Sequence, residues 1–223
     1  MTESDRPRAP FAELTGSLAG TSPLVLSWSE IEQILGAHRL YLESERRQGR
    51  RANFDSADLT GMDFSGLDLR RAKMNRAVLR EANFTGARLQ GANLIGAVLH
   101  QACLNGADLS GARLSGVNLV SASLEKACLL NADMEFGVLA NAVFSGACLC
   151  GADMSGAVLD GATLIAAEMR GVNLRGADLR DARLDGADLR EAAWARADWA
   201  AEEDAAWGAC SAEAAPAASI RLP

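Results

Sequence analysis

Residues 106–119 read GADLSGARLSGVNL, which contains three successive copies of one five-residue unit. In each copy a small residue, a variable polar residue and a large apolar residue follow one another, as in Ala107, Asp108 and Leu109. The order begins again at Ala112 and at Val117. Because an internal repeat decides the architecture of a chain, any fold proposed for this protein must explain a period of five residues.

The same register runs without an insertion from Phe54 to Trp199. One large apolar residue every five positions gives 30 units, whose central residues are 20 Leu, 4 Phe, 4 Met and 2 Trp. The position two residues before the centre is Ala in 25 of the 30 units. The exceptions are Met62, Leu67, Val117, Gly137 and Val172. Two positions of each unit therefore face a crowded interior, and the other three face outward.

Neither an α-helix nor a straight strand explains this pattern. A helix with 3.6 residues per turn would carry a five-residue period around its whole circumference, and each interior glycine would cost about 1 kcal/mol relative to alanine. In a straight strand, side chains alternate between two faces, so centres five residues apart would point to opposite sides. The chain must therefore bend once per unit, with the small residue and the centre inside the bend.

Units such as Ala57-Asp58-Leu59-Thr60-Gly61 and Ala177-Asp178-Leu179-Arg180-Asp181 resemble the A(D/N)LXX pattern of pentapeptide-repeat proteins. The resemblance covers residues 52–201 and implies an all-β solenoid, a right-handed quadrilateral parallel β-helix with four units per coil and about 7.5 coils. In that arrangement residues twenty apart stack, so like side chains form columns. The predicted core includes Phe64, Phe84, Leu109, Leu114, Phe144, Trp194 and Trp199.

The residues outside the repeats divide the chain further. Ser27 and Ser29, each followed three residues later by Glu, predict the start of a helix from about 28 to 46. Its apolar stripe needs a surface, and the open end of the solenoid is the nearest one. We therefore expect a flexible tail over 1–26, a capping helix within 27–51, the β-helix over 52–201, and a C-terminal cap with a flexible tail over 202–223. The last central residues, Trp194 and Trp199, and then Trp207 are expected to cover the last coil.

Composition excludes several classes of protein. The net charge of -7 argues against direct nucleic-acid binding, which requires an excess of Lys and Arg. An uninterrupted apolar run long enough to cross a membrane is missing, and the N-terminus does not resemble a secretory signal. Five scattered cysteines fit a reducing compartment better than a disulfide framework. These observations predict a cytoplasmic protein with no membrane association.

The sequence offers little for catalysis. A lumen filled by the central side chains leaves no cavity, and the two histidines do not pair, since His38 falls in the predicted capping helix and His100 faces outward with no second histidine in its column. Cys128, Cys148 and Cys150 share one outward face, yet a fourth ligand is missing and structural zinc sites have four. We therefore expect no enzyme activity, no cofactor and no metal site, with these cysteines lining the surface.

The outward surface carries an unusual number of apolar residues in the middle coils. Contiguous exposed apolar area is often used for contacts, although valine also suits any strand. The candidate interaction surface consists of Val78, Val98, Val120, Leu130, Phe136, Val138 and Val158. The predicted function is a non-enzymatic scaffold that binds an unidentified protein partner, with a second copy of the chain, in a homodimer, as one candidate.

An alternative comes from the same resemblance, because some pentapeptide-repeat proteins mimic duplex DNA and regulate gyrase-like topoisomerases, protecting them against quinolones. Residues 52–201 carry 18 acidic and 14 basic side chains, a net charge of only -4. A duplex carries one negative charge per about 1.7 Å, so a rod about 36 Å long would need roughly twenty net negative charges to match it. The surface charge therefore favours the scaffold over the DNA mimic.

Overall fold

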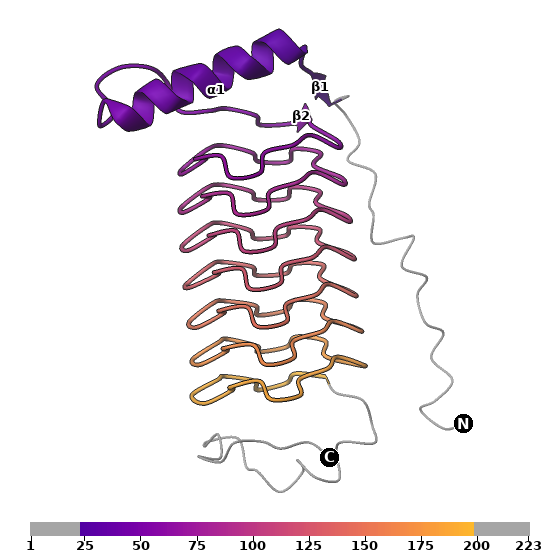
Figure 1. The fold of residues 1–223 in the computed structure, drawn as a ribbon. Helices are drawn as coiled ribbons and strands as arrows, with labels where there is room; N and C mark the ends of the chain where they lie inside the picture. The colour runs from indigo at the N-terminus through magenta and orange to yellow at the C-terminus, as the bar shows by residue number, and fades with distance from the viewer. Residues whose placement is uncertain (1–22, 199–223) are drawn as a thin grey trace, which may run out of the picture.

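A computed structural model describes residues 23–198 and shows a stack of similar coils with one helix across its N-terminal end (Figure 1). The regular elements are β1 (Leu24–Val25), α1 (Trp28–Glu43) and β2 (Ala57–Asp58). The predictions for residues 1–22 and 199–223, including Trp199 and Trp207, lie outside the described residues. In the described part of the chain, no helix is both long and apolar enough to cross a bilayer.

The coils are joined by parallel bridges between residues twenty apart, from Asn53 with Lys73 to Asp178 with Asp198. The unit around Leu109 shows the bonding. The N–H of Leu109 donates to the carbonyl of Cys128 in the following coil at 2.7 Å, and the N–H of Asp108 donates to Ala87 in the preceding coil at 2.9 Å. A turn bond from Ala112 back to Leu109 closes the bend at 2.9 Å. Each unit thus repeats the same bonds, which explains the uninterrupted register.

The bends explain why glycine recurs in the sequence. From residue 56 to residue 196 every fifth residue has a positive φ, and 15 of these 29 corner residues are Gly. Glycine adopts this left-handed conformation without a steric cost, whereas other residues do so at a cost. Several non-glycine corners lie against a glycine corner of the next coil: a Cβ added to Gly156 would stand only 2.6 Å from the ring of Phe136.

Where the residue before the centre is Asp or Asn, its side chain supports the bend from outside. In thirteen units an Asp or Asn side chain at this position accepts a hydrogen bond from the backbone N–H two residues later, at 2.9–3.4 Å. Such Asx turns satisfy an N–H that has no backbone partner. The preference for Asp and Asn therefore reflects turn chemistry.

The predicted core is buried. Every central residue from Phe54 to Leu179 is at most 2 % exposed, and the rings of Phe64 and Phe84 stack with centroids 5.0 Å apart. Burial decreases toward the last described coil, where Leu184 is 8 % exposed. Trp194, predicted as core, is only partly buried and packs against the cluster from its edge, since it belongs to the last described coil.

Two exceptions to the alanine rule compensate each other. Val117 and Gly137 occupy the same inward position in successive coils. A Cβ added to Gly137 would lie 3.5 Å from a methyl of Val117 and 3.3 Å from Leu139. The extra methyl groups of Val117 thus fill the volume that glycine leaves free, and interior packing stays dense.

Helix α1 begins as the sequence predicts. Ser27 is the N-cap, and its side chain and that of Glu30 form a reciprocal capping box. The helix ends at Glu43, three residues before the predicted end, and Ser44 caps it. The chain then turns back so closely that a Cβ on Gly49 would collide with the backbone of α1, and its φ of +71° also requires glycine.

The helix is attached to the first coil by both apolar and polar contacts. Ile31 is 1 % exposed and belongs to the core cluster, while Ile34 and Leu35 pack against it. His38 is equally buried, and its Nδ1 accepts a hydrogen bond from the N–H of Ala52 at 3.1 Å. This bond satisfies the first N–H of the repeat region, which has no preceding unit.

The predicted flexible tail over 1–26 is wrong at its end. Leu24 and Val25 form β1, which pairs in parallel with β2 in the register Leu24 with Ala57 and Val25 with Asp58. Strand β1 forms backbone hydrogen bonds with one face of the first coil. Without β1, these backbone groups would be unpaired at the edge of the solenoid. The contact includes a hydrogen bond of 2.8 Å from the N–H of Leu24 to the carbonyl of Ser56.

Candidate functional site

The valines of the candidate surface lie on one face of the solenoid, which we call the valine face. Val78 bridges to Val98, and Val138 bridges to Val158, each pair in successive coils. Asn118 separates the two pairs, and Val120 lies two residues beyond it on the same side. All five valines are only half-buried, because stacked neighbours cover part of each side chain. The valine face therefore presents two short apolar strips in place of one continuous stripe.

Among the described residues of the coils, Phe136 is the most exposed large apolar residue. It occupies the corner that immediately precedes the unit of Val138, so it borders the valine face. Its φ is 54°, and 70 % of its surface is exposed while its ring lies over Gly156. Gly137 does not receive this ring, since Val117 fills the volume beside it.

Leu130 lies apart from the other candidate residues. It is 42 % exposed and directly follows the buried Leu129. Leu130 stands twenty residues before Cys150, so it lies on the face of Cys128 and Cys148, two units before the valine face and opposite to it in a four-unit coil. The structure therefore groups six of the seven candidate residues and leaves Leu130 outside the group.

The valine face also extends beyond the repeats, which the sequence pattern does not predict. Strand β1 continues its ladder, because Val25 pairs with Asp58 and Asp58 bridges to Val78. Val25 is 80 % exposed, and Trp28 at the start of α1 is 59 % exposed. A two-residue strand is too short to produce a pattern in the sequence, so only the pairing reveals it.

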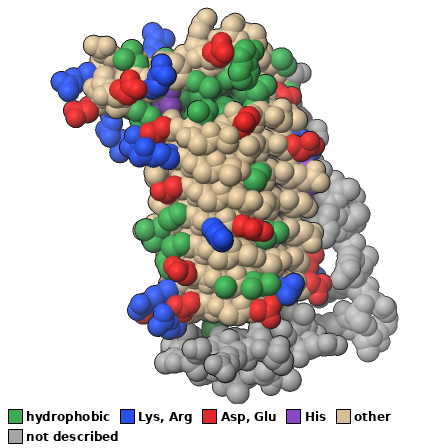
Figure 2. Space-filling view, viewed as in Figure 1, with side chains coloured by type: hydrophobic (Ala, Val, Ile, Leu, Met, Phe, Trp, Pro, Cys, Tyr) green, Lys and Arg blue, Asp and Glu red, His purple; other side chains and the backbone are tan. Residues whose placement is uncertain are grey.

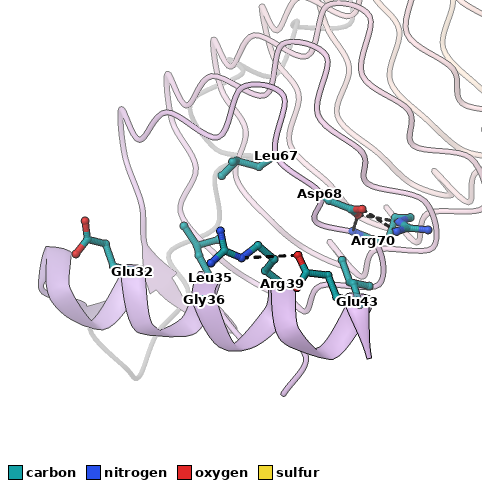
Figure 3. Close-up of a pocket in the computed structure, with 9 residues that line it drawn as sticks. Glu32, Leu35, Gly36, Arg39, Glu43, Leu67, Asp68 and Arg70 are labelled. Carbon is teal, nitrogen blue, oxygen red and sulfur yellow. Dashed lines mark hydrogen bonds and ion pairs between the residues drawn. The ribbon is translucent and has the colours of Figure 1, made fainter. Parts of the chain in front are cut away.

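An open groove of about 580 Å³ runs between α1 and the first coil (Figure 3). Leu35 from the helix and Leu67 from the coil provide its apolar walls. Leu67 stands where most units have alanine, and it is 36 % exposed because no coil precedes it. Ion pairs lie at the rim, Arg39 with Glu43 at 3.9 Å and Asp68 with Arg70 at 2.7 Å.

Arginines neutralise many of the surface carboxylates, and blue and red side chains adjoin near both ends of the rod (Figure 2). Asp178 pairs with Arg180 at 2.6 Å, and Glu191 pairs with Arg170 at 2.6 Å. Hydrogen bonding from the Arg190 side chain lowers the pKa of Asp188 to about 2. These acids are ionised at neutral pH, yet each one faces a neighbouring positive charge.

Three potential metal ligands meet on another face of the coils. Cys148, Cys150 and Glu168 each contribute one atom, and these atoms lie within 4.8 Å of one another. Burial is the main cause that raises the pKa of Cys148. Cys128 is the bridge partner of Cys148 in the preceding coil and shares its face, and its Sγ lies 3.1 Å from the hydroxyl of Ser110 one coil earlier still. Glu168 was missed, although its position twenty residues after Cys148 predicts the stacking.

Comparison with known proteins agrees with this architecture. The profile of the family described as pentapeptide repeats (8 copies) matches segments that together span residues 63–192. The chain belongs to the pentapeptide-repeat family. No curated protein sequence matches it significantly.

Several solved structures are similar. A trypsin-treated variant of QnrB1, a plasmid-mediated fluoroquinolone resistance protein, has a TM-score of 0.55 at 20% identity, covering 73% of this chain and 84% of that one. HetL from the cyanobacterium Nostoc sp. strain PCC 7120, involved in heterocyst differentiation regulation, is 28% identical over 74% of this chain and 90% of its own, with a TM-score of 0.30. Rfr23 from the cyanobacterium Cyanothece 51142 is 20% identical over 75% and 96%, with a TM-score of 0.38. The likeness to QnrB1 supports the right-handed quadrilateral β-helix and concerns the fold alone.

Proposed function

We propose that this protein is a non-enzymatic, cytoplasmic scaffold that binds a protein partner through the valine face and the adjoining Phe136. The buried columns of the coils serve packing, so recognition falls to the outward positions. The strips Val78 with Val98 and Val138 with Val158 offer flat apolar area on a rigid backbone. Flat, preorganised surfaces of this kind lose little conformational entropy when a partner binds.

Phe136 is the observation that carries the proposal. The left-handed conformation costs roughly 1–2 kcal/mol for a residue with a Cβ, and among the described corner residues Phe136 alone is aromatic. Glycine stands at 15 of the 29 corners and would remove that cost. The phenylalanine also exposes 70 % of its surface to water. A conformational cost at an exposed aromatic side chain supports a role in recognition, where aromatic residues are frequent anchors.

The surface charge disfavours mimicry of duplex DNA. A mimic needs a dense array of unpaired negative charges, whereas Asp68 is in contact with both Arg70 and Arg88, at 2.7 and 3.3 Å. Asp188 and Glu191 are likewise paired with arginines. We therefore do not propose regulation of a gyrase-like enzyme as a second function. Photo-crosslinking, which identifies the bound protein, would reveal such an enzyme as the partner.

Site-specific photo-crosslinking in the source cell tests the scaffold function. A photoreactive phenylalanine analogue is placed at Phe136 and, as the matched control, at Lys126, which occupies the equivalent corner two units earlier with φ 56°. We expect capture of one protein from position 136 and none from position 126. Val138→Lys should abolish that capture, whereas Val143→Lys, at the same position of the next unit, should leave it unchanged. Equal capture at both corners, or none at either, would contradict the proposal.

The identity of the captured protein separates the remaining alternatives. A second copy of this chain would double the mass of the crosslinked species, and the purified protein should then sediment as a dimer that Val138→Lys dissociates. A topoisomerase subunit would favour the alternative function, and a supercoiling assay with and without the protein would test it. Any other single protein supports a scaffold with a heterologous partner.

A further inference from the structure

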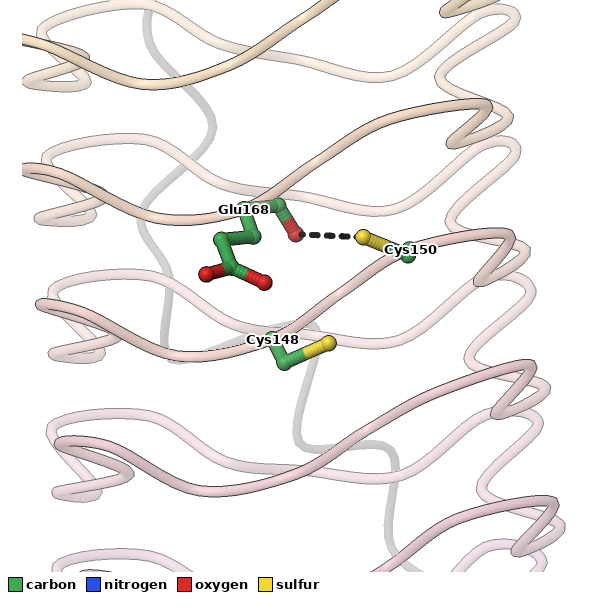
Figure 4. A group of neighbouring side chains, drawn as sticks. All are labelled: Cys148, Cys150 and Glu168. Carbon is green, nitrogen blue, oxygen red and sulfur yellow. Dashed lines mark hydrogen bonds between the residues drawn. The ribbon is translucent and has the colours of Figure 1, made fainter.

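The two thiols of Cys148 and Cys150 project from the same outer face because the residue between them, Leu149, is fully buried. Glu168 is the bridge partner of Cys148 in the next coil, so it stands directly beside the two thiols. Figure 4 shows the three side chains on the same side of two adjacent coils, with the thiol of Cys150 donating to the backbone carbonyl of Glu168 at 3.6 Å. The three ligand atoms fall within 4.8 Å of one another.

Within residues 23–198 the carboxylate of Glu168 has no hydrogen bond or ion pair, unlike the carboxylates of other acids at its position in the repeat. Eight aspartates precede a buried centre in the same way, and each binds the backbone N–H two residues later. Glu168 forms no such bond within residues 23–198, and its longer side chain extends outward. Arg170, which would match the pairing of Asp188 with Arg190, instead binds Glu191 at 2.6 Å.

We propose that Cys148, Cys150 and Glu168 bind a divalent cation of intermediate softness, and that this cation is zinc. Two thiolates and one carboxylate are a donor set that favours zinc or cadmium over magnesium or calcium. Zn–S bonds of about 2.3 Å and Zn–O bonds of about 2.0–2.2 Å place ligand atoms of one tetrahedral centre about 3.3–3.8 Å apart. Small side-chain rotations therefore close the site, and the backbone stays in place.

The site keeps one coordination position open. Three protein ligands with a fourth position left for water or an external molecule distinguish accessible zinc sites from closed structural ones. Cys128 lies in the same ladder one coil earlier, but its Sγ contacts Ser110 and leaves the three-ligand set unchanged. The coils fold around their own apolar columns, so the metal binds a preformed surface and is not required for folding.

Titration of the full, reduced chain with cadmium tests this inference. Thiolate-to-cadmium charge-transfer absorption reports how many thiolates bind, and competition with a chelating indicator then gives the zinc affinity. We expect one metal per chain and two thiolates per metal. Cys148→Ser and Cys150→Ser should each abolish the charge-transfer band or weaken binding by at least about 100-fold, and Glu168→Gln should weaken it by at least about 10-fold.

Matched controls show whether the effect belongs to this cluster. Cys103→Ser removes an outward thiol on the neighbouring face, and Glu125→Gln removes an exposed carboxylate; neither should change affinity. Thermal unfolding of each variant verifies that the coils are intact. Binding that survives Cys148→Ser, or that falls equally in Cys103→Ser, would overturn the proposal. So would a reduced protein that binds no cadmium while its oxidised form carries a Cys148–Cys150 disulfide.

Discussion

The middle coils and the N-terminal end of the molecule provide hydrogen-bond partners for their backbone groups in different ways. In the middle coils, the N–H of Asp108 donates to the preceding coil and the N–H of Leu109 donates to the following coil. The other units of these coils repeat this arrangement. At the N-terminal end no preceding coil exists, and individual residues replace it. His38 accepts the first repeat N–H, and β1 pairs with the first coil. The repeat therefore tolerates many outward substitutions, whereas the end depends on a few particular residues.

The largest expected effect comes from a charge in the middle of the stack. Leu109→Asp places a carboxylate at a position that is 0 % exposed, where it finds neither water nor a positive partner. We expect the variant to fail to fold, judged by loss of a cooperative thermal transition. Gln101→Asp, at an exposed corner nearby, is the control and should melt normally. A soluble, cooperatively melting Leu109→Asp protein would refute the register.

A smaller effect tests the vertical packing between coils. Gly137→Ala adds a methyl against Val117 and Leu139, and overpacking of this kind typically costs about 1–3 kcal/mol. The double variant Val117→Ala with Gly137→Ala restores two ordinary units and should recover most of that loss in denaturant unfolding. Additive free-energy changes in this double-mutant cycle would mean that the two positions are not coupled.

Mild acid should loosen the N-terminal end before it affects the coils. Burial lowers the pKa of His38, an effect that the charge of Asp68 opposes and those of Arg51 and Arg70 reinforce. The unfolded chain, with a His pKa of about 6.5, therefore binds the proton more readily than the folded one. Stability from neutral His38 is complete above about pH 6.5 and is lost as pH falls through its lowered folded value.

Hydrogen exchange of residues 28–43, corrected for intrinsic rates, measures this loss. The coils should keep their protection in that pH range, because the lowered pKa values of Asp178 and Asp188 affect stability only below the ordinary aspartate value of 3.8. His38→Gln retains an acceptor for the Ala52 N–H without a titrating group, so its helix protection should vary little with pH. If hydrogen exchange in the wild-type helix did not change with pH, His38 would not be the residue that stabilises the N-terminal end.

The smallest effect is expected at the corner of Phe136. Phe136→Gly relieves the positive φ but loses the contact of the ring with Gly156 and adds backbone entropy to the unfolded chain. We expect the unfolding free energy to change by less than about 1 kcal/mol, while partner capture is lost. A large destabilisation would indicate that the ring serves packing and not recognition.

Much of the fold follows from the sequence because the repeat encodes it thirty times. The stacked rings of Phe64 and Phe84 follow directly from a twenty-residue coil. The unique contacts do not, because each occurs once and has no periodic signal. His38 shows both cases. It falls on the same helical stripe as Ile31, Ile34 and Leu35, so helical spacing predicts its burial. No spacing predicts its hydrogen bond to Ala52.

The candidate surface likewise has a part that the repeat period predicts and a part that it does not predict. The period places Val78, Val98, Val138 and Val158 on one face, and the structure agrees. Leu130 was grouped with them only because it points outward in the middle coils, which does not specify the face. Val25 joins the valine face through strand pairing, a contact that no local pattern encodes.

Residue-resolved hydrogen exchange over 52–198 tests the central claim most directly. In the units from Ala72 to Gly176, four of the five amides donate to another backbone carbonyl, while the amide directly after the buried centre does not. Exchange should therefore be fastest at the amides after a centre that no Asp or Asn side chain binds, as at Arg80 and His100, and slow at the other four amides of each unit. Protection with no five-residue period would contradict the stacked coils and everything inferred about their surface.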